Sequence, residues 1–137
     1  MSNRSLRDNI ALPIATHGKL SAADEAARVQ ALLAEFHLES VAGLRPHEVD
    51  GTARFRTCAA RAVALDPAWL VVEGVGDFDA NLGLSPTWRS LVRRATESTS
   101  ALAVCLSRPN GALTAGLAHF GARVYGCFAD EAPGGHT

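Results

Sequence analysis

The residues best placed to do chemistry lie where an expected helix begins or an expected strand ends. A helix N-terminus presents unpaired backbone N–H groups that bind anions, and the carboxyl ends of parallel strands bring side chains together at one edge of a sheet. Phosphate binding and metal binding are therefore the chemistries to consider. Five residues hold such positions: Asp50, Gly51, Thr52, Glu73 and Ser107. Asp79 lies in the loop that follows the first expected strand.

Several of these residues also have a simpler structural interpretation. Asp50 is favoured as a helix N-cap, because its carboxylate can accept from backbone N–H groups of the first turn. Glu73 is favoured as a strand-end carboxylate, solvated or paired with an arginine, and a metal ligand is the alternative. Ser107 lacks the G-x-S-x-G pattern of an activated serine. Residues 74–76 lack the third glycine of a dinucleotide-binding loop.

Histidine and cysteine indicate neither a metal site nor a disulfide framework. The five histidines share no metal-ligand spacing. The three cysteines (Cys58, Cys105 and Cys127) are far apart and form no Cys-x-x-Cys pair, which is typical of a reducing cytoplasm. We therefore predict no catalytic residue and no bound metal.

Size and composition narrow the class of protein. A chain of 137 residues, 47% apolar and 20% charged, is most simply one globular domain. A net charge of −1 gives no electrostatic reason to bind nucleic acid. The sequence has no apolar run of about 18 residues and no evident signal peptide. We expect a cytoplasmic protein without direct membrane insertion.

The pattern divides the domain into four segments. Residues 1–20 are expected to be extended, with Pro13 and Gly18 as breakers. Residues 21–66 are expected to be helical. Ser21 caps a helix whose apolar face is Val29, Leu32, Leu33 and Phe36, and a helix after Asp50 carries Phe55, Cys58, Ala59, Ala62 and Val63.

Residues 67–128 are expected to be a strand-helix core of an α/β fold, and residues 129–137 a tail. Strands are predicted near 69–72, 101–106 and 123–128, with helices from Pro86 and over 110–120. This alternation indicates a short parallel sheet with flanking helices, and the first strand is expected to be covered on both faces. Because three strands are few, a partner, a dimer or a missing N-terminal half is also expected.

From Ser5 to about Phe128 the chain resembles the part of the ATP-binding subunits of ATP-binding cassette (ABC) transporters that follows the Q-loop. Residues 60–67 are similar to the family's Ala-Arg-Ala-Leu-Ala-x-Asp-Pro, and residues 48–56 stand where its signature motif belongs. Residues 69–74 match the Walker B strand, 78–79 the D-loop, and 106–108 the position of the switch histidine. The resemblance implies a partial RecA-like, P-loop-type ATPase core, with residues 21–66 containing the helical subdomain.

The departures from the family lie at positions that handle nucleotide. No G-x-x-x-x-G-K-[ST] phosphate loop is present. Asp50 replaces the signature serine, before the retained Gly51. Glu73 stands at the magnesium-side aspartate, Gly74 at the catalytic glutamate and Ser107 at the switch histidine. We therefore expect no cofactor and no hydrolysis by this chain alone, with ATP and magnesium bound only if a partner chain supplies the phosphate loop.

The resemblance also predicts partners. Residues 6–13 are similar to the segment that meets the permease in importers, so Leu6, Ile10, Leu12 and Pro13 are predicted to contact a partner, or else to pack on this chain's own core. An ABC permease or a full-length ABC ATPase is the expected partner, in a homo- or hetero-oligomer at the inner face of the membrane.

Three functions stay open on the sequence. One is a degenerate ABC subunit with a structural or regulatory role in transport. Another is a fragment that completes an ATP site with a second chain. The last is a small α/β ligand-binding module or enzyme with its site near the strand ends.

Overall fold

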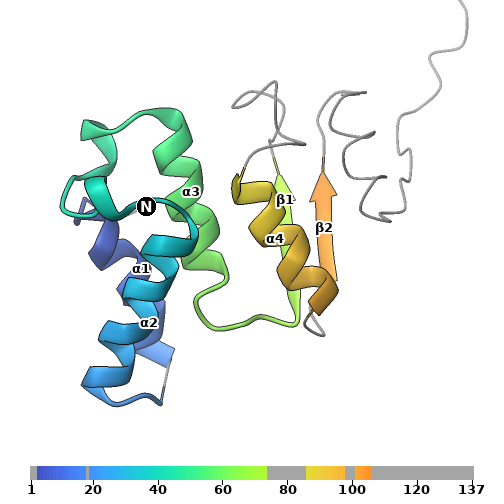
Figure 1. Cartoon of the computed structure of the whole chain (residues 1–137), viewed down its shortest axis with the longest axis horizontal. Coiled ribbons are helices and arrows are strands. Elements are labelled where there is room, and N and C mark those ends of the chain that lie inside the picture. Colours follow the sequence, from blue (N-terminus) through green and yellow to red (C-terminus); the bar gives the residue numbers. More distant parts are fainter. Residues whose placement is uncertain (1–2, 18, 74–85, 98–100, 106–137) are drawn as a thin grey trace, which may run out of the picture.

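The computed structural model describes residues 3–17, 19–73, 86–97 and 101–105. Figure 1 shows α1, α2 and α3 gathered together, with α4 lying against a pair of strands. The expected helix over 110–120, the strand over 123–128 and the tail lie outside the described residues. The elements in order are α1 (Leu6–His17), α2 (Ala22–Glu35), the 3₁₀ helices η1 (Glu39–Val41) and η2 (Pro46–Glu48), α3 (Gly51–Ala62), β1 (Trp69–Glu73), α4 (Pro86–Glu97) and β2 (Ala101–Cys105).

The first 20 residues are not extended as predicted, because Leu6–His17 forms helix α1. Its first turn is anchored by two backbone bonds, from the Leu6 N–H to the Leu44 carbonyl at 2.8 Å and from the Arg7 N–H to the Ala42 carbonyl at 2.9 Å. These bonds satisfy donors that a helix start otherwise leaves to water. The loop before η2 therefore fixes where α1 begins.

Pro13, the expected breaker, lies inside α1. A proline in a helix interior costs about 3 kcal/mol, whereas each large apolar side chain that is buried contributes about 1.5–3 kcal/mol. Leu6, Ile10 and Ile14 recur one turn apart and are all buried in the core. The prediction failed because tertiary packing of this face outweighs the preference of one residue.

Helix α2 follows the prediction closely. Ser21 caps it, its Oγ accepting from the Asp24 N–H at 3.2 Å. The helix ends in a Schellman motif, with the Leu38 N–H donating to the Leu33 carbonyl at 2.8 Å and His37 at a left-handed φ of 53°. Its predicted apolar face is the centre of the core: Val29, Leu32, Leu33 and Phe36 are all buried.

Helix α3 begins after Asp50 as predicted, and Ala59 and Val63 of the predicted apolar face are buried, but the face is only partly correct. Thr57 and Ala60 are buried, while Cys58 and Ala62 are exposed. Helix α3 packs against α1, and small residues on the buried face let the two backbones approach closely. The apolar pattern does not predict the burial of Thr57, because threonine is polar. Its hydroxyl donates to the Ala53 carbonyl at 2.8 Å, so the side chain is buried without an unsatisfied polar group.

The strands β1 and β2 pair in parallel, with Trp69 opposite Ala101 and Glu73 opposite Cys105. Their positions and direction agree with the sequence pattern, and α4 begins at Pro86 as expected. Its predicted face is buried at Trp88, Leu91 and Val92. The assignment of this unit to a P-loop-type ATPase core stays a prediction.

The prediction that β1 is covered on both faces is wrong. Trp69 is 72% exposed and Val71 57% exposed. Leu70 and Val72, which point to the opposite face, pack against the core. Successive side chains of a strand alternate between faces, so a continuous apolar run cannot reveal which face lacks a cover.

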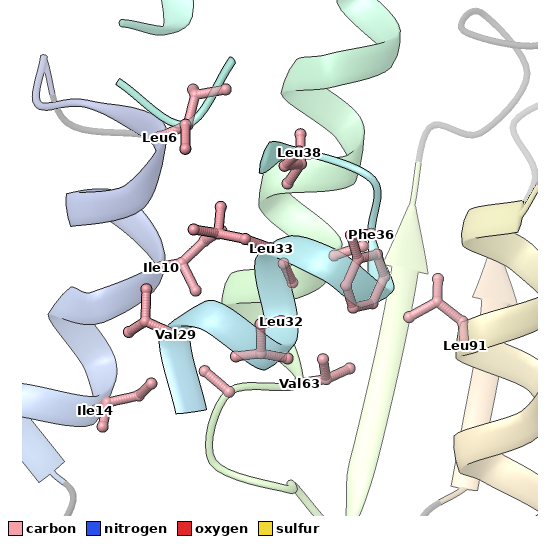
Figure 2. Close-up of a cluster of buried hydrophobic side chains, with 14 of the residues drawn as sticks. Leu6, Ile10, Ile14, Val29, Leu32, Leu33, Phe36, Leu38, Val63 and Leu91 are labelled. Carbon is pink, nitrogen blue, oxygen red and sulfur yellow. The ribbon is translucent and has the colours of Figure 1, made fainter. Parts of the chain in front are cut away.

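A single apolar core joins the helices to the strand unit (Figure 2). Leu91 of α4 points toward Phe36 of α2 and Val63 beyond the end of α3. The rings of Phe55 and Trp88 pack beside one another, with centroids 6.0 Å apart and planes tilted by 35°. The two parts therefore meet through an apolar contact that α4 provides.

Candidate functional site

The start of α3 is the best described part of the candidate site. The Asp50 carboxylate accepts a hydrogen bond from the Ala53 N–H at 2.7 Å, which confirms its interpretation as an N-cap. Gly51 is half-buried as the first helical residue and Thr52 is exposed as the second. Because the N-terminus of a helix attracts anions, the carboxylate occupies a position that a phosphate would otherwise find favourable.

The loop that leads into α3 is held by its own residues. The Glu48 carboxylate accepts from the Arg45 N–H at 2.6 Å. The Arg54 guanidinium donates to the Val49 carbonyl at 3.0 Å and to the Pro46 carbonyl at 3.4 Å. Arg54 therefore ties the loop to the helix that follows it, and the position of Asp50 is fixed from both sides.

The remaining nucleotide-site candidates are not brought together by the described structure. Glu73 is the last residue of β1, opposite Cys105 in the strand register. Gly74, Asp79 and Ser107 lie outside the described residues. Whether these residues approach Asp50 stays a prediction.

The predicted partner segment is corrected for two of its four residues. Leu6 and Ile10 are completely buried in the chain's own core, so they are not available to a partner. Leu12 and Pro13 are half-buried on α1. The helical period, with Leu6 and Ile10 one turn apart, is the signal that separates inward from outward residues once α1 is recognised.

A cluster of charged side chains that the sequence did not indicate lies where α2, α4 and the turn before β1 meet. Arg94 donates from Nε and Nη2 to the two oxygens of Glu35, at 3.0 and 2.6 Å, and from Nη1 to Asp66 at 2.9 Å. The Glu35 hydrogen bond, together with the charges of Glu35 and Asp66, raises the pKa of Arg94 above its ordinary value, although partial burial opposes this.

Two further arginines complete this Arg94 cluster, which consists of Arg28, Glu35, Asp66, Arg93 and Arg94. Arg28 donates to Asp66 at 2.7 Å, and Arg93 donates to Glu35 at 3.2 Å. The available sequence signal was the Arg93-Arg94 pair in the last turn of an expected helix. Its acidic partners are 28 and 59 residues away in sequence, and only the folded arrangement identifies them.

The described residues offer no metal site and no membrane span. No group of three or more histidine, cysteine, aspartate or glutamate side chains within them could hold a metal ion. None of the helices described is both long enough and apolar enough to cross a bilayer.

Comparison with known proteins relates part of the chain to ABC ATP-binding proteins. No family model matches it. Over 81 residues it is 38% identical to the glutathione import ATP-binding protein GsiA of Shigella boydii serotype 4 (strain Sb227) and to that of Escherichia coli (strain K12). The protein of the same name from Escherichia coli O1:K1 / APEC is 37% identical. The matched segment is 58% of this chain and 13% of each relative.

This partial similarity supports a relation to the ATP-binding proteins of ABC transporters. It agrees with the predicted resemblance at the level of the family. Because the chain spans only about an eighth of the length of these relatives, their activity does not transfer with the similarity.

Proposed function

We propose that this chain is an ABC ATP-binding-subunit-like protein of a transport system that does not hydrolyse ATP and acts as a structural or regulatory partner. The proposed location is the cytoplasm, at the inner face of the membrane. The similarity to GsiA supports the family relation, since that protein's name describes an ATP-binding protein of import. A permease or a full-length ABC ATPase is the partner that the proposal implies.

The Asp50 cap carries the claim that ATP is not hydrolysed. A carboxylate fixed 2.7 Å from the Ala53 N–H satisfies the start of α3 and places negative charge beside it. Two unit charges about 4 Å apart repel by about 1 kcal/mol in water and more where water is excluded. A nucleotide phosphate at this position would therefore meet repulsion in place of a donor.

Calorimetry with Mg·ATP and an assay of released phosphate test this proposal on the purified chain. We expect no binding heat up to about 1 mM nucleotide, which corresponds to an affinity weaker than about −4 kcal/mol, and no phosphate release. Asp50→Ser is the matched variant, because serine also caps a helix but carries no charge. Micromolar binding by the parent chain would contradict the proposal.

A second function, completion of an ATP site with another chain, is favoured by the exposed face of β1. Trp69 and Val71 leave an apolar strip that further structure could cover. Co-purification with a chain that carries a phosphate loop, followed by an ATPase assay of the complex, tests this alternative. A complex that forms but releases no phosphate would support the first proposal over the second.

A further inference from the structure

The Arg94 cluster joins three segments that are distant in sequence. Glu35 ends α2, Asp66 lies in the turn before β1, and Arg94 lies in the last turn of α4. One guanidinium contacts both carboxylates, with bonds of 2.6–3.0 Å. The cluster therefore lies across the boundary between the helices and the strand unit, outside the proposed nucleotide site.

Both carboxylates stand where the local backbone does not favour them. Glu35 is at the C-terminal end of α2, where the helix dipole is negative and a carboxylate is repelled. Asp66 has a left-handed φ of 47°, a conformation that is uncommon for residues other than glycine, although aspartate adopts it more often than most. Arg93 pairs with Glu35 and Arg28 pairs with Asp66, and Arg94 is the cation that contacts both carboxylates.

We propose that the Arg94 cluster is a salt-sensitive latch that seats α4 and the Asp66 turn on the end of α2. When the latch is weakened, Glu35 and Asp66 lose the cation that they share. Arg93 and Arg28 still pair with them, but neither of these arginines joins the two carboxylates. The end of α4 then moves away from α2. The contact between Trp88 of α4 and Phe55 of α3, which we call the joint, becomes more accessible to small molecules.

The exposure of these groups makes the latch responsive to ionic strength. The Glu35 side chain is 16% exposed and that of Arg94 is 21% exposed, while Asp66 is 64% exposed. Mobile ions reach the exposed members of the cluster, Asp66 and the 55% exposed Arg93, and the screening length falls from more than 10 Å in dilute salt to about 3 Å at 1 M. The Arg94–Glu35 pair is largely covered and is screened less. The apolar contacts of Trp88 and Leu91 are not weakened in this way.

Trp88 is a built-in reporter of the joint. It is 1% exposed beside Phe55, whereas Trp69, the other tryptophan of the chain, is 72% exposed. Replacing Trp69 with phenylalanine leaves Trp88 as the single source of tryptophan fluorescence. Quenching by neutral acrylamide then measures access to the joint, and far-UV circular dichroism shows whether the helices stay folded.

The test is a salt titration of W69F, W69F/R94M and W69F/R89M, where Arg89 is an exposed arginine on the same helix. In W69F and in the Arg89 control, we expect the quenching constant of Trp88 to rise about twofold between about 0.05 M and about 1 M sodium chloride. In W69F/R94M we expect it to be higher at low salt and to respond less to added salt, because only the Arg28–Asp66 and Arg93–Glu35 pairs remain. W69F/E35Q should lie between the two.

The proposal is overturned if quenching of Trp88 in folded W69F does not respond to salt. It is also overturned if a folded R94M variant responds to salt as the Arg89 control does. Should R94M fail to fold, the salt titration of W69F and W69F/R89M decides the matter alone. Nucleotide binding is not measured in this experiment, so its outcome is independent of the proposed function.

Discussion

The helices α1–α3 and the unit of β1, α4 and β2 differ in how completely their apolar side chains are buried. The helices cover one another's apolar faces with their own side chains (Figure 2). In the strand unit, α4 contacts β2, and Leu70 and Val72 of β1 pack against the core, while Trp69 and Val71 stay exposed. Within the residues that the structure describes, the core therefore buries one face of β1 and leaves Trp69 and Val71 exposed on the other.

The two tryptophans of the chain differ in burial in the same way. Trp88 is inside the joint and Trp69 is on the uncovered face. Both residues belong to predicted apolar segments, and the sequence pattern predicts that both are buried. Stability should therefore depend on the helices and the joint, while the outer face of β1 should be nearly neutral to stability and available for association.

The sharpest contrast compares Phe36→Ala with Val71→Ala. Phe36 is completely buried at the centre of the core, so its truncation should lower the free energy of unfolding by about 3–5 kcal/mol. Val71 is more than half exposed, and its replacement should change stability by no more than about 0.5 kcal/mol. Urea denaturation followed by circular dichroism measures both variants.

Equal effects of these two variants would break the comparison. A large loss at Val71 would mean that the outer face of β1 is covered in solution, either by this chain or by a second copy. Sedimentation of the parent and of Val71→Ala at the same concentration separates these cases, because only association depends on protein concentration.

Pro13→Ala tests how strongly the helices hold α1 against its sequence. Alanine restores a backbone N–H in the helix interior and removes the ring that crowds the preceding turn. We expect a gain of about 1–2 kcal/mol, which is less than the full proline cost because alanine also makes the unfolded chain more flexible. Thermal unfolding measures the gain, and a loss would show that the half-buried ring contributes more through packing.

Asp50→Ala tests how much the cap of α3 contributes to stability. Asp50 belongs to the nucleotide site that the two regions were expected to share. Loss of the cap should lower stability by about 1 kcal/mol, and Asp50→Asn should lose only a few tenths because asparagine also caps. If both variants lose the same amount, the charge of Asp50 matters more than its hydrogen bond. Ser21→Ala at the start of α2 provides a matched cap in the other helix.

The sequence predicted the features that depend on short spacing. The caps at Ser21 and Asp50, the apolar face of α2 and the parallel pairing of two strands were all found. Each follows from residues within a few positions of one another or from a general rule of chain connection. Local pattern was sufficient for these features because the energies involved are local.

What the sequence did not predict depends on contacts between distant segments. Helix α1 forms around Pro13 because α2 and α3 bury its apolar face. On α3, which packs against α1, Thr57 and Ala60 are buried, whereas Cys58 and Ala62 of the predicted face are exposed. The Arg94 cluster unites residues up to 59 positions apart, and no spacing rule connects them. Such features are properties of the assembled core.

The smallest expected effect concerns pH at the joint between the two regions. The hydrogen bond to Glu35 raises the pKa of Arg94 in the folded chain above its ordinary value. A group with a raised folded pKa contributes stability that is fully present below its unfolded pKa and is lost only as the pH rises through the folded pKa. Between about pH 6 and about pH 9, Arg94 is protonated in both states.

The difference in unfolding free energy between the parent and Arg94→Met should therefore be constant across this window, at about 1–3 kcal/mol for a charged hydrogen-bonded group that is largely covered. The same difference should shrink as salt is added, because screening weakens the attraction without changing protonation. A strong pH slope without a salt effect would mean that a titrating group other than Arg94 controls the joint. Constancy with pH and sensitivity to salt together identify a permanently charged arginine as the contact between the covered and the uncovered region.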